Sequence, residues 1–250
     1  MHKIADKLTQ VKHRIQQAAR LSGRYPNEIT LLAVSKKHSE EAIREAYLAG
    51  QQHFGENYLQ EALTKIKKVQ EEGICWHFIG PIQGNKAKKI AEKFDWVHSV
   101  DRLKVAQKLS KHRPETKGAL NVCLQINIDS EDTKSGILPD NALELARAVA
   151  KLPNINLRGL MAIPEKDIAP GTEDNAFSRL RQLFEELKLH NKRLASMDTL
   201  SMGMSADLET AVWEGSTIVR IGTDIFGPRP TEDDLHTGAD VPQRSESEAG

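Results

Sequence analysis

The sequence predicts an α/β protein, a single (β/α)8 TIM-type barrel with one extra helix at its N-terminus. Short apolar runs alternate with helical patterns from end to end, which is typical of strands joined by crossover helices. The chain has 250 residues, a length at which such barrels commonly form one domain. The G-x-G-x-x-G fingerprint of a dinucleotide-binding open sheet does not occur, which disfavours the doubly wound alternative.

The first predicted element is a helix within residues 2–21. Its apolar positions fall on one stripe that would dock on the barrel: Ile4, Leu8, Val11, Ile15, Ala18 and Ala19. The segment is basic with a single acid, Asp6, so a transit peptide is the alternative. We favour the docked helix.

Eight short apolar runs follow, and each has the length of a strand. The predicted strands are 30–35, 52–54, 75–79, 95–99, 120–127, 156–162, 197–201 and 217–221. Helical patterns separate them near 39–49, 57–71, 84–93, 102–112, 139–151, 173–190 and 206–214. This alternation predicts right-handed βαβ units and a parallel sheet. We expect the barrel to occupy residues 1–229 and the polar tail, residues 230–250, to be disordered.

Composition narrows the functional classes. Lys+Arg and Asp+Glu balance at 35 each, so net charge gives no argument for nucleic acid or an anionic membrane. No run approaches the ~18 apolar residues of a membrane span. Cys75 and Cys123 lie in apolar segments without zinc-ligand spacing. We read them as reduced core residues of a cytoplasmic protein and expect no metal site.

Lys36 ends the apolar run Thr30–Lys36, where a buried strand should emerge at the mouth of the barrel. Leu32, Val34 and Lys36 would share one strand face by the period of two. Hydrophobic side chains behind an amine disfavour its ammonium form, and a Schiff-base lysine needs the neutral amine. The alternative is a solvated loop lysine.

Two segments near the C-terminus suit a phosphate. Barrels often bind phosphate at the loops after strands 7 and 8, where Ser201 and the pair Gly222–Thr223 are predicted to lie. Glycine permits close backbone approach and the hydroxyls supply neutral donors. Ser205 we read instead as the N-cap of helix 206–214. A lysine and a phosphate site together point to pyridoxal 5'-phosphate (PLP).

Arg220 is predicted to face the barrel mouth, together with Ile218 and Gly222. A guanidinium there needs an anion or an acceptor, and the pyridine nitrogen of PLP is such an acceptor. An Arg only donates, so it leaves that nitrogen unprotonated and weakens the ring as an electron sink. The alternative is an Arg paired with a barrel carboxylate.

Several motifs run in order through residues 30–229: LLAVSKK, FGENYLQE, WHFIGPIQGNK, LRGLMAIP, DTLSMGMSADLETAV and STIVRIGTDIFGPR. They resemble the pyridoxal phosphate homeostasis protein family, whose fold is like the N-terminal barrel of alanine racemase. The resemblance implies that Lys36 carries PLP as a Schiff base and that Arg220 meets the ring nitrogen. It also implies that the phosphate is bound by Ser201, Gly222 and Thr223, and that the pocket is lined by Asn57, His77 and Met204. From the residues alone we favour a satisfied core histidine for His77, and a solvated loop lysine over a secondary PLP contact for Lys134.

We expect a PLP-binding protein without catalytic turnover that stores, buffers or delivers the cofactor, with PLP-dependent apo-enzymes as candidate recipients. The alternative is a PLP-dependent amino-acid racemase, which needs a second base on a further domain. The chain ends at the barrel, so we favour binding, and we expect a monomer. A class I aldolase, whose barrel lysine attacks the substrate, is a remoter alternative.

Overall fold

The computed structural model describes residues 3–131, 134–164, 175–190 and 192–228. The predicted tail, residues 230–250, lies outside the described residues. None of the described helices has both the length and the apolar character that a membrane span requires.

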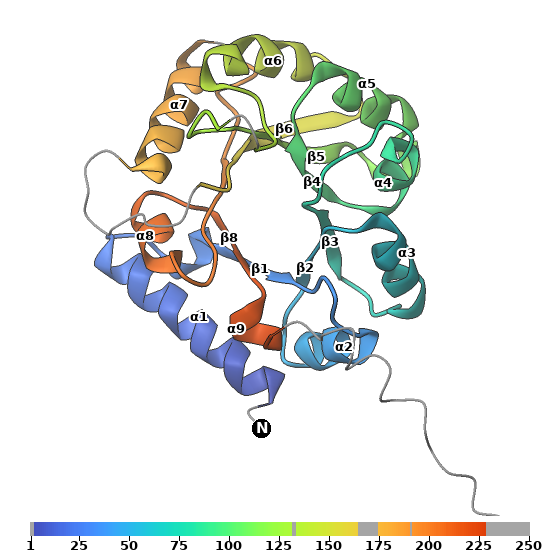
Figure 1. Cartoon of the computed structure of the whole chain (residues 1–250), viewed down its shortest axis with the longest axis vertical. Helices are drawn as coiled ribbons and strands as arrows, with labels where there is room; N and C mark the ends of the chain where they lie inside the picture. The colour runs from blue at the N-terminus through green and yellow to red at the C-terminus, as the bar shows by residue number, and fades with distance from the viewer. Residues whose placement is uncertain (1–2, 132–133, 165–174, 191, 229–250) are drawn as a thin grey trace, which may run out of the picture.

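Eight parallel strands close into a barrel in chain order, with β1 paired to both β2 and β8 (Figure 1). The strands are β1 (Thr30–Val34), β2 (His53–Glu56), β3 (Cys75–Phe78), β4 (Trp96–Val100), β5 (Leu120–Gln125), β6 (Ile155–Met161), β7 (Thr199–Ser201) and β8 (Ile218–Ile221). The predicted fold class is therefore confirmed, and each strand lies within a few residues of its predicted range.

Helices form a ring outside the strands (Figure 1). They are α1 (Ile4–Leu21), α2 (Glu40–Leu48), α3 (Leu59–Lys68), α4 (Ala87–Lys93), α5 (Leu103–His112), α6 (Ala142–Val149), α7 (Ala176–His190), α8 (Leu208–Trp213) and α9 (Thr223–Phe226). The short α9 was not predicted. It follows β8 directly, so Thr223 opens a helix and does not lie in a loop.

The predicted N-cap at Ser205 is wrong. Helix α8 begins at Leu208 and its N-cap is Asp207. The Asp207 carboxylate accepts a hydrogen bond from the backbone N–H of Met204 at 2.5 Å, and this bond closes the turn before the helix. Ser205 lies within that turn, two residues before the N-cap position, and the Asp207 side chain itself caps no N–H of the helix.

Helix α1 docks on the barrel as predicted. Its stripe of Leu8, Val11, Ile15, Ala18 and Ala19 is buried, and the helix packs along α8 and α9. Arg14 adds polar links, because it donates to Glu209 at 2.7 Å and to Asp224 at 2.6 Å. The first helix is thus part of the wall beside the end of β8.

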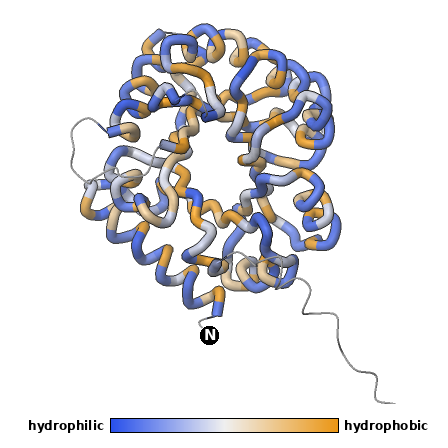
Figure 2. Tube along the Cα trace, viewed as in Figure 1, coloured by the Kyte–Doolittle hydropathy of each residue, from blue (hydrophilic) through white to orange (hydrophobic). Residues whose placement is uncertain are grey.

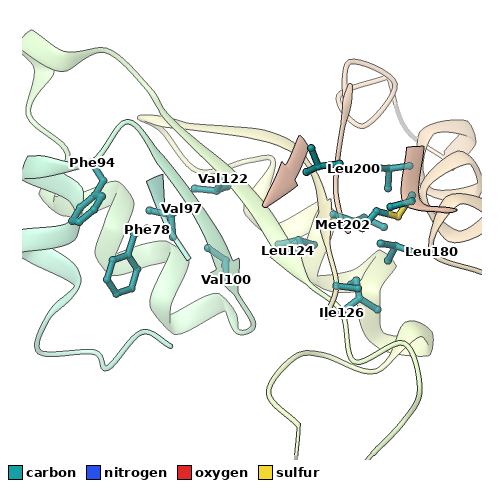
Figure 3. Packing of buried hydrophobic residues seen from close by; sticks show 14 of the residues in the cluster. Phe78, Phe94, Val97, Val100, Val122, Leu124, Ile126, Leu180, Leu200 and Met202 are labelled. Atoms are coloured by element: carbon teal, nitrogen blue, oxygen red, sulfur yellow. The ribbon is translucent and has the colours of Figure 1, made fainter. Parts of the chain in front are cut away.

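The hydrophobic core lies between the strands and the helices. Outward-facing side chains of β3–β5, such as Phe78, Val97 and Val122, pack against the helices, and Leu200 and Met202 do the same on the β7 side (Figure 3). Hydrophobic and hydrophilic residues are interspersed along the chain trace all round the barrel (Figure 2). Part of the barrel interior is polar instead, because His77, His98, Ser201 and Arg220 contact one another there.

Candidate functional site

Lys36 lies at the mouth of the barrel, half-buried in the turn after β1. Strand β1 ends at Val34, two residues earlier than the alternation argument assumed, so the strand period does not determine the direction of the lysine. The end of β1 packs on Gly222, where an added Cβ would lie 3.1 Å from the Val34 carbonyl oxygen. Lys36 and the Gly222–Thr223 segment therefore share one end of the barrel.

A buried ion pair beneath the mouth fixes the turn that carries Lys36. The Lys65 ammonium donates to the Ser35 carbonyl oxygen at 2.7 Å, to Glu56 Oε1 at 2.7 Å and to Glu61 Oε1 at 2.6 Å. All three ammonium hydrogens are thereby used. The Ser35 hydroxyl also donates to Glu56 Oε1, at 2.6 Å. Burial raises the pKa of the Glu56 carboxyl, and the Lys65 charge partly opposes this.

Arg220 is a buried cation that makes no ion pair with a carboxylate of the described residues. Its Nη1 donates to the carbonyl oxygen of Ser201 at 2.6 Å and to the Ser201 hydroxyl at 3.0 Å, and its Nη2 donates to the Ala162 carbonyl oxygen at 2.9 Å. Burial lowers its pKa to about 10, so it stays charged at neutral pH. Within the part of the chain that the structure describes, the alternative of an Arg paired with a barrel carboxylate is therefore not observed. Five N–H donors meet three acceptors, which leaves donors for a further group.

A chain of three histidines runs inward from Ser201. His98 Nδ1 lies 2.8 Å from Ser201 Oγ, His77 Nδ1 lies 2.9 Å from His98 Nε2, and His53 Nδ1 lies 3.0 Å from His77 Nε2. Burial lowers the pKa of all three imidazoles, that of His98 to about 3. The rings are therefore neutral at physiological pH, and each bond holds one proton whose side depends on the tautomer.

The position of His77 matches the core-histidine alternative. It is fully buried, both ring nitrogens have partners, and His98 separates it from Ser201 and Arg220. The Ser201 hydroxyl is likewise held inside the barrel, between His98 and Arg220. Its geometry suits the orientation of Arg220 better than direct contact with a phosphate.

A pocket of about 240 Å³ opens at the mouth, and Asn57 and Lys134 are among its lining residues, with Ile79 and Gln125. Asn57 Oδ1 is buried and has no hydrogen-bond partner among the described residues. Lys134 is not simply solvated: it pairs with Glu131 and with Asp129. A polar atom without a partner, in a pocket that also holds a lysine, fits a bound polar ligand.

The remaining predicted residues lie around the ends of β7 and β8. Gly203, with φ at 94°, carries the chain over α8, where a Cβ would lie 2.4 Å from the Ala211 methyl. Met204 and Ser205 follow, both half-buried, and Thr223 is exposed at the start of α9. Gly203, Met204, Ser205 and Thr223 are not among the residues that line the pocket at Asn57.

Sequence reasoning missed the partners of the predicted residues. His98 and Lys65 are fixed by contacts between strands or between a strand and a helix, which no local motif reports. His53 also went unnoticed, and Cys75 was read only as a core residue, although the alternation Cys75-x-His77 within one strand indicates that both side chains share a face. Burial and the nearby Asp95 raise the pKa of the Cys75 thiol to about 12, so this thiol is protonated.

Comparison with known proteins gives the family. The family model described as "Alanine racemase, N-terminal domain" matches residues 7–230. The pyridoxal phosphate homeostasis protein of Pseudomonas aeruginosa is 53% identical over 229 residues, which cover 92% of this chain and 97% of that protein. The chain belongs to this family. The protein of the same name from Escherichia coli K12 is 51% identical and covers 92% of this chain and 98% of its own length.

Solved structures agree with the fold. PipY of Synechococcus elongatus, in a structure described as having PLP bound, is 36% identical with a TM-score of 0.76 over 90% of this chain and all of that one. Alanine racemase from Corynebacterium glutamicum is 16% identical with a TM-score of 0.66, and the likeness covers 90% of this chain and 63% of that one. The latter similarity shows the barrel alone.

Proposed function

We propose that the chain binds PLP at the mouth of the barrel and serves in PLP homeostasis, as storage, buffer or delivery protein. The observation that carries the proposal is Arg220, a buried cation without a carboxylate partner among the described residues, beside the mouth that Lys36 and Gly222 share. The buried Asn57 Oδ1 adds an unused acceptor to the same end. Relatives named for PLP homeostasis support the cofactor.

Each residue has a distinct part in the proposal. Lys36 binds the aldehyde carbon covalently as a Schiff base, and Arg220 donates to the ring nitrogen. Gly222 and Thr223 hold the phosphate. Ser205 is the second hydroxyl donor, because its side chain makes no hydrogen bond to the described residues. Ser201 acts through Arg220, which it holds in place with its carbonyl and its hydroxyl. When bound, PLP would supply an electron sink, which an unprotonated ring nitrogen weakens.

Borohydride reduction followed by peptide mapping tests the attachment. We expect phosphopyridoxyl on the peptide that contains Lys36, and its loss in Lys36→Ala. Lys134 is the matched control, since it is the lysine of the pocket lining. Modification of Lys134 with Lys36 unmodified would refute the assignment.

Binding of PLP, compared with binding of pyridoxal, which lacks the phosphate, shows which hydroxyl groups contact the phosphate. Thr223→Ala and Ser205→Ala should each weaken PLP binding by about 1.5–3 kcal/mol, the usual worth of a hydrogen bond to a charged group, and leave pyridoxal binding unchanged. Ser201→Ala should weaken both ligands alike, because its effect passes through Arg220. If Ser201→Ala weakens the binding of PLP but not that of pyridoxal, Ser201 contacts the phosphate directly and the proposal for Ser201 is wrong.

We further propose that the protein lacks appreciable turnover on amino acids. The Arg220 guanidinium can only donate hydrogen bonds, so the ring nitrogen that it contacts stays unprotonated. An unprotonated ring stabilises a carbanion at Cα poorly. Incubation with L-alanine in deuterated water should leave Cα unlabelled. Deuterium incorporation at about 1 s⁻¹ or faster, abolished by Lys36→Ala, would instead support the racemase alternative. Cytoplasmic location, a monomeric state and transfer to PLP-dependent apo-enzymes belong to the same proposal.

A further inference from the structure

The polar interior of the barrel holds a second cluster of chemically competent side chains, at the end opposite the mouth. His53 lies at the start of β2, in register with Cys75 at the start of β3. Cys75 and His77 lie two residues apart on β3, so their side chains share the inner face. One potential ligand atom from each of His53, Cys75 and His77 lies within 4.8 Å of the other two. The proposed PLP site uses neither His53 nor Cys75.

We propose that His53, Cys75 and His77 form a binding site for one Zn²⁺ ion at the N-terminal end of the barrel. The inference goes beyond the proposed function and does not depend on it. Two imidazole nitrogens and a thiolate are the ligand types that Zn²⁺ prefers, and three protein ligands leave a fourth position for water.

The distances match a tetrahedral site. Zn–N bonds of about 2.0–2.1 Å and a Zn–S bond of about 2.3 Å at tetrahedral angles place neighbouring ligand atoms about 3.3–3.6 Å apart. His53 Nδ1 lies 3.0 Å from His77 Nε2, and Cys75 Sγ lies 3.4 Å from the same nitrogen. Two of the three edges are thus within a few tenths of an ångström of the metal-bound geometry.

The surroundings orient the ligands. His77 Nδ1 lies 2.9 Å from His98 Nε2, and its ring stacks on Trp96 with centroids 5.5 Å apart and an angle of 8°. A metal-bound histidine usually donates its other ring N–H to an acceptor that fixes its tautomer, and His98 Nε2 is placed to accept it here. The Asp95 carboxylate accepts from the Trp76 backbone N–H at 3.0 Å, so a negative charge lies beside Cys75.

An ion can reach the cluster from solvent. His53 and Cys75 are both half-buried, and His53 lines a cavity of about 310 Å³ at this end of the barrel, together with Thr30, Gln51 and Gln52. His77 is the fully buried ligand behind them. The site therefore has one fully buried ligand and two partly exposed ligands on the side that faces solvent.

Binding follows a simple proton balance. The thiol proton of Cys75 leaves to solvent as the sulfur binds Zn²⁺. Each neutral imidazole keeps its one hydrogen, and the hydrogen in the His53–His77 bond moves by exchange with solvent to a nitrogen that faces away from the metal. His77 then carries its hydrogen on Nδ1 and donates to His98, and His53 carries its hydrogen on Nε2. No oxidant or reductant is needed.

Zinc titration of the untagged, chelator-treated full-length chain tests the site, with metal content measured after dialysis. We expect one Zn²⁺ per chain and no competition from Mg²⁺, which prefers oxygen ligands. Cys75→Ser and His53→Gln should each weaken Zn²⁺ binding at least about 100-fold, the upper range for loss of a mere supporting residue. Cys123→Ala and His13→Gln are the matched controls and should bind as the parent chain does.

Spectroscopy distinguishes a built site from surface binding. Co²⁺ should give the visible d–d bands of a four-coordinate ion, at wavelengths beyond those of PLP, and Cys75→Ser should abolish them. ¹⁵N spectra of the histidines should show His77 in its Nδ1–H form once Zn²⁺ is present. Far-UV circular dichroism checks that each variant is folded. Equal Zn²⁺ binding by the parent chain, Cys75→Ser and His53→Gln, or no retained Zn²⁺, would overturn the proposal.

Discussion

Replacement of Lys65 by Met should be among the most damaging single changes outside the hydrophobic core. Lys65 and Glu56 are 3% and 0% exposed, and the ammonium makes three hydrogen bonds of 2.6–2.7 Å. Met preserves the unbranched apolar stem but removes the charge. Because Glu56 would remain buried with only the Ser35 hydroxyl as partner, we expect a loss of about 3–5 kcal/mol in the free energy of unfolding.

The double variant tests the mechanism. If the cost comes from the orphaned carboxylate, Glu56→Gln in the Lys65→Met background should recover a large part of it. Lys68→Met is the matched control: it lies on the same helix and pairs with Glu40 at 2.8 Å, but its side chain is 59% exposed. That surface pair should be worth less than about 1 kcal/mol. Urea unfolding followed by circular dichroism measures all four proteins.

The pH dependence of this loss has a definite sign. Burial already raises the pKa of Glu56 above the usual glutamate value of 4.5, and removal of the Lys65 charge raises it further. A group whose pKa is higher in the folded state favours folding below its unfolded pKa and loses that contribution as pH rises through the folded value. The Lys65→Met penalty should therefore shrink toward pH 4.5 and grow toward neutrality. A loss under about 1 kcal/mol, no recovery in the double variant, or a penalty that grows on acidification would refute the reasoning.

Three further predictions concern the barrel wall. Gly159→Ala would place a Cβ 1.8 Å from the Thr199 carbonyl oxygen, so urea unfolding should show a loss above about 3 kcal/mol; an unchanged midpoint would contradict the β6–β7 packing. Arg113→Lys should cost about 1.5–3 kcal/mol, because the guanidinium donates to four carbonyl oxygens at once; a silent substitution would show that a single ammonium suffices. Burial raises the pKa of the Cys123 thiol to about 12. Iodoacetamide at pH 8 should therefore leave Cys123 unmodified in the native protein. Rapid labelling of Cys123 would show that the barrel interior opens to solvent.

The fold could be read from the sequence because its determinants are local. Short apolar runs alternate along the chain with amphipathic helical patterns. Each strand or helix can therefore be predicted from the residues of its own segment. Ser201 and Gly222–Thr223 were placed at strand ends for the same reason. Helix α9 escaped because four residues are too few to show a helical period.

The tertiary structure alone decided how the functional groups connect. Lys65 reaches Ser35 and Glu56 across two elements, and His98 meets Ser201 from the opposite wall of the barrel, 103 residues away in sequence. Such contacts depend on the register with which eight strands close, and register is a property of the whole sheet. The sequence by itself determined the barrel and which strand ends carry Lys36 and Gly222. Closure of the barrel determined that Arg220 lacks a carboxylate partner among the described residues and that His53, Cys75 and His77 converge, because only closure brings separate strands within reach of one another.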